Sequence, residues 1–190
     1  CEVSLKRRGG TLPSGSQPLS SVLFITLGAV ALGTGIWLLF LRRYDRIEPE
    51  ALRYLLRVAA LGGVMSIAAA AVLNEGFSNL LGLDVATITE PGSVPYTTLF
   101  AFCLFAGFCE EICKAIASVY STRWVGDLDE PVDAMIYAMT VALGFAAVEN
   151  VLYAQTYGNE VLLVRFLWPV PAHMCYAAVW GYGLAKASSS

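Results

Sequence analysis

Five apolar stretches dominate this sequence, and each is long enough to cross a lipid bilayer as a helix. A transmembrane helix needs about 20 consecutive, mostly apolar residues. The backbone inside a bilayer must satisfy its own hydrogen bonds, so each stretch is expected to be helical. The sequence therefore predicts an all-α fold, a polytopic bundle with about five transmembrane helices. The expected spans are residues 21–41, 55–73, 95–120, 132–157 and 161–185.

The composition agrees with a lipid environment. Of the 190 residues, 57% are hydrophobic and only 14% are charged, whereas about 25% of the residues in soluble domains are charged. The net charge of −3 is small, and no basic patch with interleaved aromatic residues is present. Nucleic acid is therefore not an expected partner. We expect an integral membrane protein whose surroundings are the lipid bilayer.

The chain divides into four parts on this reading. Residues 1–20 form a polar tail, residues 21–41 a first transmembrane helix, residues 42–187 a membrane domain, and residues 188–190 a polar end. The five cysteines show no CxxC spacing, and most lie within apolar stretches. We expect them to be small packing residues rather than a disulfide or metal framework.

The third apolar stretch contains three charged residues within five positions: Glu110, Glu111 and Lys114. Each charge at the centre of a membrane helix costs roughly 2.5–3.5 kcal/mol on insertion scales. The i, i+3 and i, i+4 spacings allow Lys114 to lie beside both acids. Two adjacent carboxylates in a low dielectric favour retaining a proton on one of them, which suits a general base near neutral pH. A buried ion pair that orients the helices is the structural alternative.

The last two stretches add further polar residues at membrane depth. Glu149 and Asn150 follow an apolar run, where the amide can position a water or an oxyanion, or the pair can simply link helices. His173 is the one histidine of the chain, and Pro169 and Pro171 open the helix just before it. A packing role and a functional role for this histidine both stay open.

The segment that leads into the fourth stretch is acidic. Asp127 and Asp129 fit a solvated helix start, where the helix dipole favours negative charge. Asp133 lies one step inside the stretch, and we expect it to be structural.

Taken in order, these motifs resemble the PrsW-type intramembrane proteases, relatives of the CAAX-processing glutamic proteases. Residues 110–114, Glu-Glu-Ile-Cys-Lys, match the EExxK motif of that family. Residues 130–150 resemble its next helix and residues 165–173 the helix after that. The resemblance covers roughly residues 42–187, and the ordered set is more specific than EExxK alone.

The resemblance implies proteolysis of single-pass membrane proteins in the bacterial plasma membrane, without a serine or cysteine nucleophile. Glu110 or Glu111 would activate water, with Glu149, Asn150 and His173 as further catalytic groups. No cofactor and no metal are expected, because one histidine with glutamates on separate helices matches zinc sites poorly. The supporting residues would be Lys114, Arg165 and Asp133.

Family members usually continue into another helix with a further histidine, in a segment resembling HGxYD, and this sequence ends before such a segment. A general base without its oxyanion partners loses several kcal/mol of transition-state stabilisation. A non-catalytic PrsW-like subunit of a larger membrane complex therefore stays open beside the endopeptidase. A transporter or proton path through the buried acids is a weaker third reading, because no internal repeat is visible.

Overall fold

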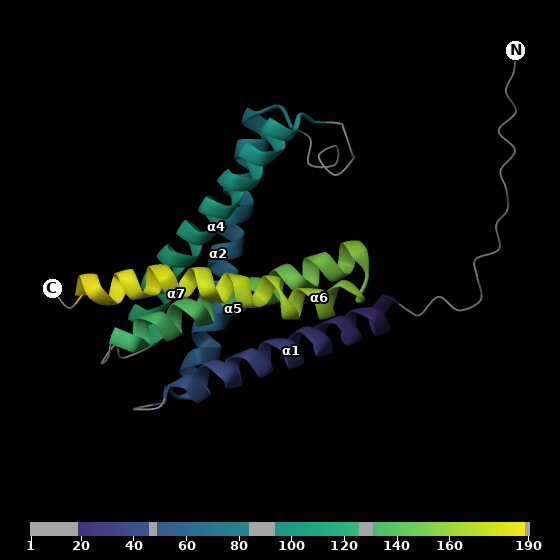
Figure 1. The fold of residues 1–190 in the computed structure, drawn as a ribbon. Coiled ribbons are helices and arrows are strands. Elements are labelled where there is room, and N and C mark those ends of the chain that lie inside the picture. Colours follow the sequence, from purple (N-terminus) through teal and green to yellow (C-terminus); the bar gives the residue numbers. More distant parts are fainter. Residues whose placement is uncertain (1–18, 46–48, 84–93, 126–130, 189–190) are drawn as a thin grey trace, which may run out of the picture.

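The computed structural model describes residues 19–45, 49–83, 94–125 and 131–188, and the regular elements in these ranges are all α-helices (Figure 1). The predicted all-α class is confirmed. Residues 1–18 of the expected polar tail, Asp127, Asp129 and residues 189–190 lie outside the described ranges. The helices are α1 (Leu19–Tyr44), α2 (Leu52–Leu80), α4 (Tyr96–Val125), α5 (Pro131–Tyr157), α6 (Val161–Leu167) and α7 (Pro169–Ser188).

The long helices agree with the expected transmembrane spans. Four segments are long and apolar enough to cross a membrane, with α6 and α7 counted together as one. The remaining expected span, α4, has 30 residues but carries Glu110, Glu111 and Lys114 in its middle. The prediction of about five spans therefore agrees with the helices found. The four apolar spans are Ser20–Tyr44, Leu52–Leu80, Val132–Tyr157 and Val161–Ala187.

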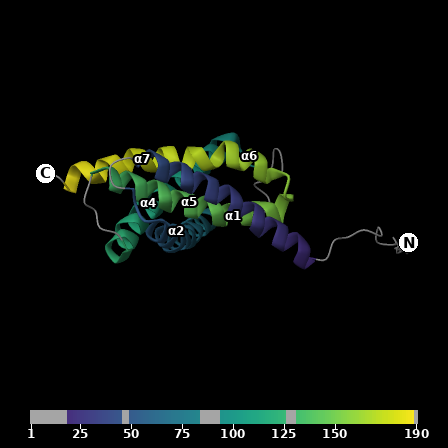
Figure 2. The ribbon, with the colours of Figure 1, turned by 90° about the horizontal axis from the view of Figure 1, so that it is seen from below.

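Helix α5 lies at the centre of the bundle, and its residues Tyr137, Val141 and Ala146 are fully buried. Helices α1, α5 and α7 extend in similar directions, whereas α2 and α4 form an antiparallel pair that crosses them (Figure 1). Viewed from below, α2 is seen end-on while α1, α5 and α7 lie across the page (Figure 2). The α2–α4 pair therefore meets the other helices over a limited region, and this region contains the charged residues of α4.

Two glycines set the distance between α2 and α5. A Cβ atom added to Gly144 would meet the carbonyl group of Ala59, and one added to Gly63 would meet the backbone of Gly144. Small residues of this kind let membrane helices pack with their backbones in contact. This close crossing fixes the α2–α4 pair against α5.

The last membrane segment is broken just before His173. Helix α6 ends at Leu167, and α7 begins at Pro169 after Trp168, whose backbone is not helical (φ −124°, ψ −65°). Proline is well accepted in the first helical turn, where its missing N–H would have no partner anyway. The break expected at the two prolines is confirmed, and it places His173 in the second turn of α7.

Candidate functional site

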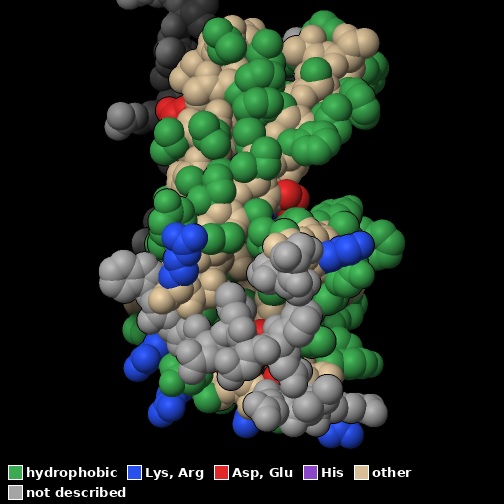
Figure 3. All heavy atoms as spheres, turned by 90° about the vertical axis from the view of Figure 1, so that its left-hand side faces the viewer, with side chains coloured by type: hydrophobic (Ala, Val, Ile, Leu, Met, Phe, Trp, Pro, Cys, Tyr) green, Lys and Arg blue, Asp and Glu red, His purple; other side chains and the backbone are tan. Residues whose placement is uncertain are grey.

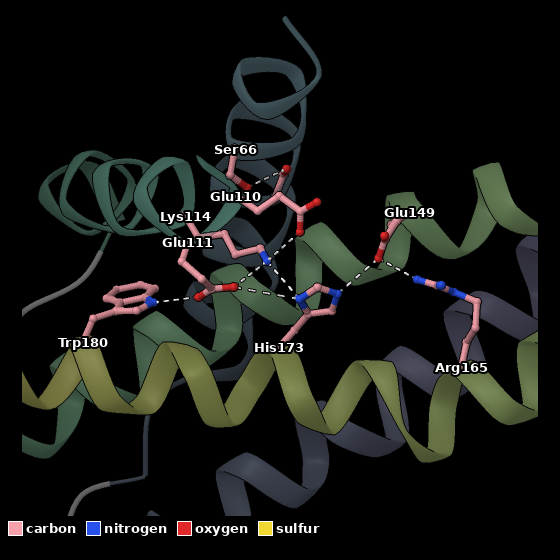
Figure 4. A network of polar contacts seen from close by, with 9 residues as sticks. Ser66, Glu110, Glu111, Lys114, Glu149, Arg165, His173 and Trp180 are labelled. Atoms are coloured by element: carbon pink, nitrogen blue, oxygen red, sulfur yellow. Dashed lines mark hydrogen bonds and ion pairs between the residues drawn. The ribbon is translucent and has the colours of Figure 1, made fainter. Parts of the chain in front are cut away.

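Lys114 is the centre of a polar cluster that joins α4 to α7. Its side chain is completely buried. The Nζ atom lies 2.9 Å from Oε1 of Glu111, 3.6 Å from Oε2 of Glu110 and 2.9 Å from Nδ1 of His173 (Figure 4). Nζ also lies 3.9 Å from the centre of the Phe145 ring of α5, within the range of a cation–π contact. The buried ammonium group is therefore compensated by groups from three helices.

Glu149 of α5 anchors the other end of the cluster. Its Oε2 atom accepts a hydrogen bond of 2.5 Å from the Arg165 guanidinium. The Nε atom of Arg165 donates to Oδ1 of Asn150 at 2.6 Å, and the guanidinium carbon lies 3.8 Å from the centre of the Tyr153 ring. Arg165 is thus held by a carboxylate, an amide and an aromatic face, a set that suits a planar guanidinium.

His173 connects the two ends, because Nδ1 faces Lys114 and Nε2 lies 3.2 Å from Oε2 of Glu149 (Figure 4). An ammonium group has only donors, so the contact with Lys114 makes Nδ1 the acceptor. Nε2 then carries the ring proton and donates it to the Glu149 carboxylate. With Lys114 charged, these two contacts are satisfied by a neutral imidazole with its proton on Nε2, while Oε1 of Glu111 lies farther from Nδ1, at 4.0 Å.

Trp180 is a member of this cluster that the sequence analysis missed. Its Nε1–H donates to Oε2 of Glu111 at 3.0 Å, so both carboxylate oxygens of Glu111 are bound (Figure 4). Trp180 follows His173 by seven residues, which is about two helical turns. This spacing puts both side chains on one face of α7, and it could have been found once His173 was treated as functional.

The structure brings together seven of the eight residues expected at the site. Asn150 belongs to the cluster through Arg165, but it is completely buried and is not among the residues that line the cavity described below. Asp133 is the exception. It is buried in the first turn of α5, roughly 24 Å along the helix from Glu149 at 1.5 Å per residue.

A cavity of about 580 Å³ lies between α4 and α7 and ends at the cluster. Its polar end is formed by Glu110, Glu111 and His173. The side of the molecule in Figure 3 shows hydrophobic side chains gathered along the outer part of the α2–α4 pair and an acidic side chain in the notch beneath it. A groove with apolar walls and an acidic floor can hold an apolar chain segment next to an activated water. The apolar walls are Cys103, Leu104, Gly107 and Phe108 from α4, with Tyr176 and Val179 from α7.

The donors of this site do not fit a metal ion. The position between Glu110, Glu111 and His173 is taken by the Lys114 ammonium, and Glu149 is paired with Arg165. A catalytic zinc site needs three protein ligands with lone pairs free for the metal, and lysine and arginine offer none. Within the described residues, no group of three histidine, cysteine or acidic side chains is arranged to hold a metal ion.

Comparison with known proteins identifies a matching family. Residues 50–190 match the family described as PrsW family intramembrane metalloprotease. The chain is 37% identical over 99 residues to Protease PrsW of Shouchella clausii, covering 52% of this chain and 46% of that protein. It is 35% identical over 103 residues to Protease PrsW of Bacillus subtilis, covering 54% of this chain and 47% of that protein.

A longer match is to Protease PrsW of Geobacillus kaustophilus, 29% identical over 143 residues, which covers 75% of this chain and 58% of that protein. The chain spans about half the length of the curated relatives it matches. No solved structure matches the chain.

Proposed function

This chain belongs to the PrsW family of intramembrane proteases, and on that premise we propose that it cleaves membrane-anchored proteins within the bilayer, by a water molecule that a glutamate activates. Its apolar helices and its bacterial relatives make it an integral membrane protein of the bacterial plasma membrane. The observation that carries the proposal is a pair of adjacent carboxylates at the floor of a groove with apolar walls, beside a buried lysine.

The contacts favour Glu110 as the general base. Both oxygens of Glu111 are bound, one to Lys114 and one to Trp180. Glu149 accepts from Arg165 and His173 and does not line the cavity. Glu110 lines the cavity and, among the described residues, makes only the longer 3.6 Å contact with Lys114. Its carboxylate therefore has lone pairs available for a water molecule next to a bound peptide.

The proposed chemistry needs one proton acceptor and one nearby positive charge. Glu110 takes a proton from water while the water oxygen bonds to the peptide carbonyl carbon, and the carbonyl oxygen becomes an oxyanion. The same proton then passes to the leaving nitrogen as the C–N bond breaks, which regenerates the Glu110 carboxylate. The buried charge of Lys114, in a low dielectric, offsets the negative charge that develops in the transition state.

The remaining polar residues hold this arrangement in place. Glu111, which Trp180 holds by a hydrogen bond, orients the lysine. His173 contacts Lys114 through Nδ1 and Glu149 through Nε2, and so links the lysine to Glu149. Arg165 fixes Glu149, and Asn150 acts on the site through Arg165 rather than by touching substrate. In this proposal Asn150 and Arg165 are positioning residues. Asp133 stabilises the start of α5.

The description of the family names a metal, but the cations at this site are side chains, so we derive no step through a metal ion. The alternative role, a non-catalytic subunit of a larger complex, is not favoured, since the matching relatives are named as proteases.

The proposed substrate is a single-pass membrane protein. The walls support this class, because Leu104, Phe108, Tyr176 and Val179 are exposed apolar side chains that line the cavity.

The test uses the full chain in proteoliposomes with a single-span membrane protein as substrate. Glu110→Gln is expected to abolish cleavage, and Glu111→Gln to reduce it strongly through Lys114, while both variants stay folded. Glu75→Gln is the matched control, because Glu75 is an exposed acid on α2 away from the cavity. Unchanged cleavage by both site variants would contradict the proposal.

A further inference from the structure

Gly107 lies in the wall of the cavity, and we propose that it forms a specificity subsite for a bulky apolar side chain of the substrate, one or two residues from the bond that is cut. The inference rests on the proposed function and goes beyond it, because it names a feature of the substrate and the residue that selects it. It depends on the open space at Gly107, on its place relative to Glu110 and on the chemistry of its neighbours.

Within the described parts of the chain, nothing fills the space beside Gly107. A Cβ atom added there meets nothing within 4 Å, and Gly107 lines the cavity between α4 and α7. The glycines that pack helices together behave differently, because a Cβ on Gly63 or Gly144 would meet backbone atoms of the partner helix. Packing therefore does not explain a glycine at position 107, in the interior of a helix where alanine is the better helix former.

Gly107 lies close to Glu110, the proposed general base, along α4. Gly107 precedes Glu110 by three residues, so the two lie on nearly the same face of α4. Their separation along the helix axis is roughly 4.5 Å at 1.5 Å per residue. An extended peptide advances by about 3.3–3.6 Å per residue. A substrate carbonyl beside Glu110 therefore places a side chain one or two residues away over Gly107.

The neighbours of Gly107 define what fits. Leu104 and Phe108 flank it on α4, and Tyr176 lies on the opposing wall. Among the residues that the structure describes, acidic and basic side chains line the cavity only at its polar end, where Glu110, Glu111 and His173 lie. A substrate side chain in the space over Gly107 therefore contacts the apolar side chain of Leu104 and the aromatic rings of Phe108 and Tyr176. The subsite therefore accepts leucine or phenylalanine, and any side chain at position 107 would take up the same volume.

The experiment compares cleavage profiles of the wild type and two variants in which position 107 is filled. The probe is a set of lysine-flanked peptides with one apolar span, in which each central position in turn is Ala, Leu or Phe. Cut sites are identified by mass spectrometry. The wild type is expected to prefer Leu or Phe at one fixed position from the cut. Gly107→Val is expected to weaken this preference, and Gly107→Phe to reverse it toward Ala by at least tenfold.

Gly183→Phe is the matched control. Gly183 is a glycine of α7 with nothing within 4 Å of an added Cβ, and it does not line the cavity. Its substitution adds the same ring to the surface of the bundle, so the wild-type profile is expected to persist. An identical residue preference in the wild type and in Gly107→Phe would overturn the inference.

Cys103 provides a readout that does not need catalysis. Its thiol is exposed and lines the cavity one turn before Gly107. In a background with Cys1, Cys109 and Cys175 replaced by serine, a peptide with Phe at the preferred position is expected to slow alkylation of Cys103. The protection is expected to disappear in Gly107→Phe and to persist in Gly183→Phe. Equal protection of all three proteins, or of none, would overturn the subsite.

The two proposals therefore fail in different ways. If neither these peptides nor the membrane protein in proteoliposomes is cut, but Phe peptides protect Cys103 in the wild type and in Gly183→Phe and not in Gly107→Phe, the catalytic proposal fails and Gly107 stands as part of an apolar binding site. For this comparison the Phe position is scanned along the peptide, since no cut site then defines it. If peptides are cut with the same profile by all variants, the protease activity stands and the subsite fails.

Discussion

The Nζ atom of Lys114 lies 2.9 Å from Nδ1 of His173, and no part of the lysine side chain is exposed. This contact joins α4 to α7 across 59 positions of sequence. It has two consequences, because the ammonium both holds the glutamates of α4 and fixes which nitrogen of the imidazole carries a proton. The first two predictions test these consequences separately.

Removing the Lys114 charge is expected to destabilise the bundle and to abolish activity. Lys114→Met keeps a long, unbranched side chain but removes its charge, which leaves Glu111 without its closest cation. Loss of one partner of a buried ion pair costs about 3–5 kcal/mol, measurable as a fall in the free energy of unfolding in detergent. The control Arg123→Met removes an exposed cation from the last turn of the same helix, where a change below about 0.5 kcal/mol is expected. Equal stability of both variants would contradict the central role of Lys114.

The protonation state of His173 can be read directly, because it is the one histidine in the chain. In the NMR spectrum of a sample labelled with ¹⁵N-histidine, Nε2 is expected to be protonated and Nδ1 to be unprotonated at neutral pH. In Lys114→Met the Nδ1 atom loses its donor, so the ring is expected to exchange between tautomers or to become doubly protonated beside the glutamates. A doubly protonated ring in the wild type at neutral pH would contradict the assigned tautomer.

Trp180 is expected to affect both stability and catalysis. Trp180→Phe keeps the aromatic ring but removes the 3.0 Å hydrogen bond to Glu111. A hydrogen bond to a charged group contributes about 1.5–3 kcal/mol to stability, so Trp180→Phe is expected to be the less stable of the two tryptophan variants. Cleavage per folded molecule is also expected to fall, because Glu111 then holds Lys114 less firmly. Trp37→Phe is the matched control, because its indole donates to the backbone oxygen of Phe166, away from the site. It is expected to lower stability by about 1 kcal/mol with turnover unchanged. Equal turnover in both variants would remove Trp180 from the site.

Two glycine substitutions are expected to change stability in opposite directions. In Gly144→Ala the new Cβ would meet the carbonyl group of Ala59, and such overpacking costs about 1–3 kcal/mol. In Gly183→Ala the Cβ meets nothing within 4 Å, so the gain in helix propensity of up to about 1 kcal/mol is retained. Thermal or denaturant unfolding of the two variants measures the difference. A stabilised Gly144→Ala would mean that α2 and α5 do not cross at this point.

Much of the fold could be predicted from the sequence, because a bilayer leaves few structural choices to an apolar stretch of about 20 residues. The break in the last span could be predicted as well, since Pro169 and Pro171 are incompatible with a continuous helix through that point. The crossing of α2 over α5 could not be predicted. It depends on Gly63 meeting Gly144, which are 81 positions apart, and nothing local in either helix indicates the partner.

Two features of the site follow from the sequence, the charged groups at membrane depth and the position of Lys114 beside two glutamates, because helical spacing fixes contacts within one turn. Only the tertiary structure distinguishes the two glutamates that line the cavity. Trp180 and Lys114 bind both oxygens of Glu111, whereas Glu110, among the described residues, makes only the 3.6 Å contact with Lys114. Such pairings depend on the rotation and crossing of separate helices, which side-chain packing sets and which no local pattern encodes. The same packing leaves the space beside Gly107 empty and thereby gives the cavity its shape.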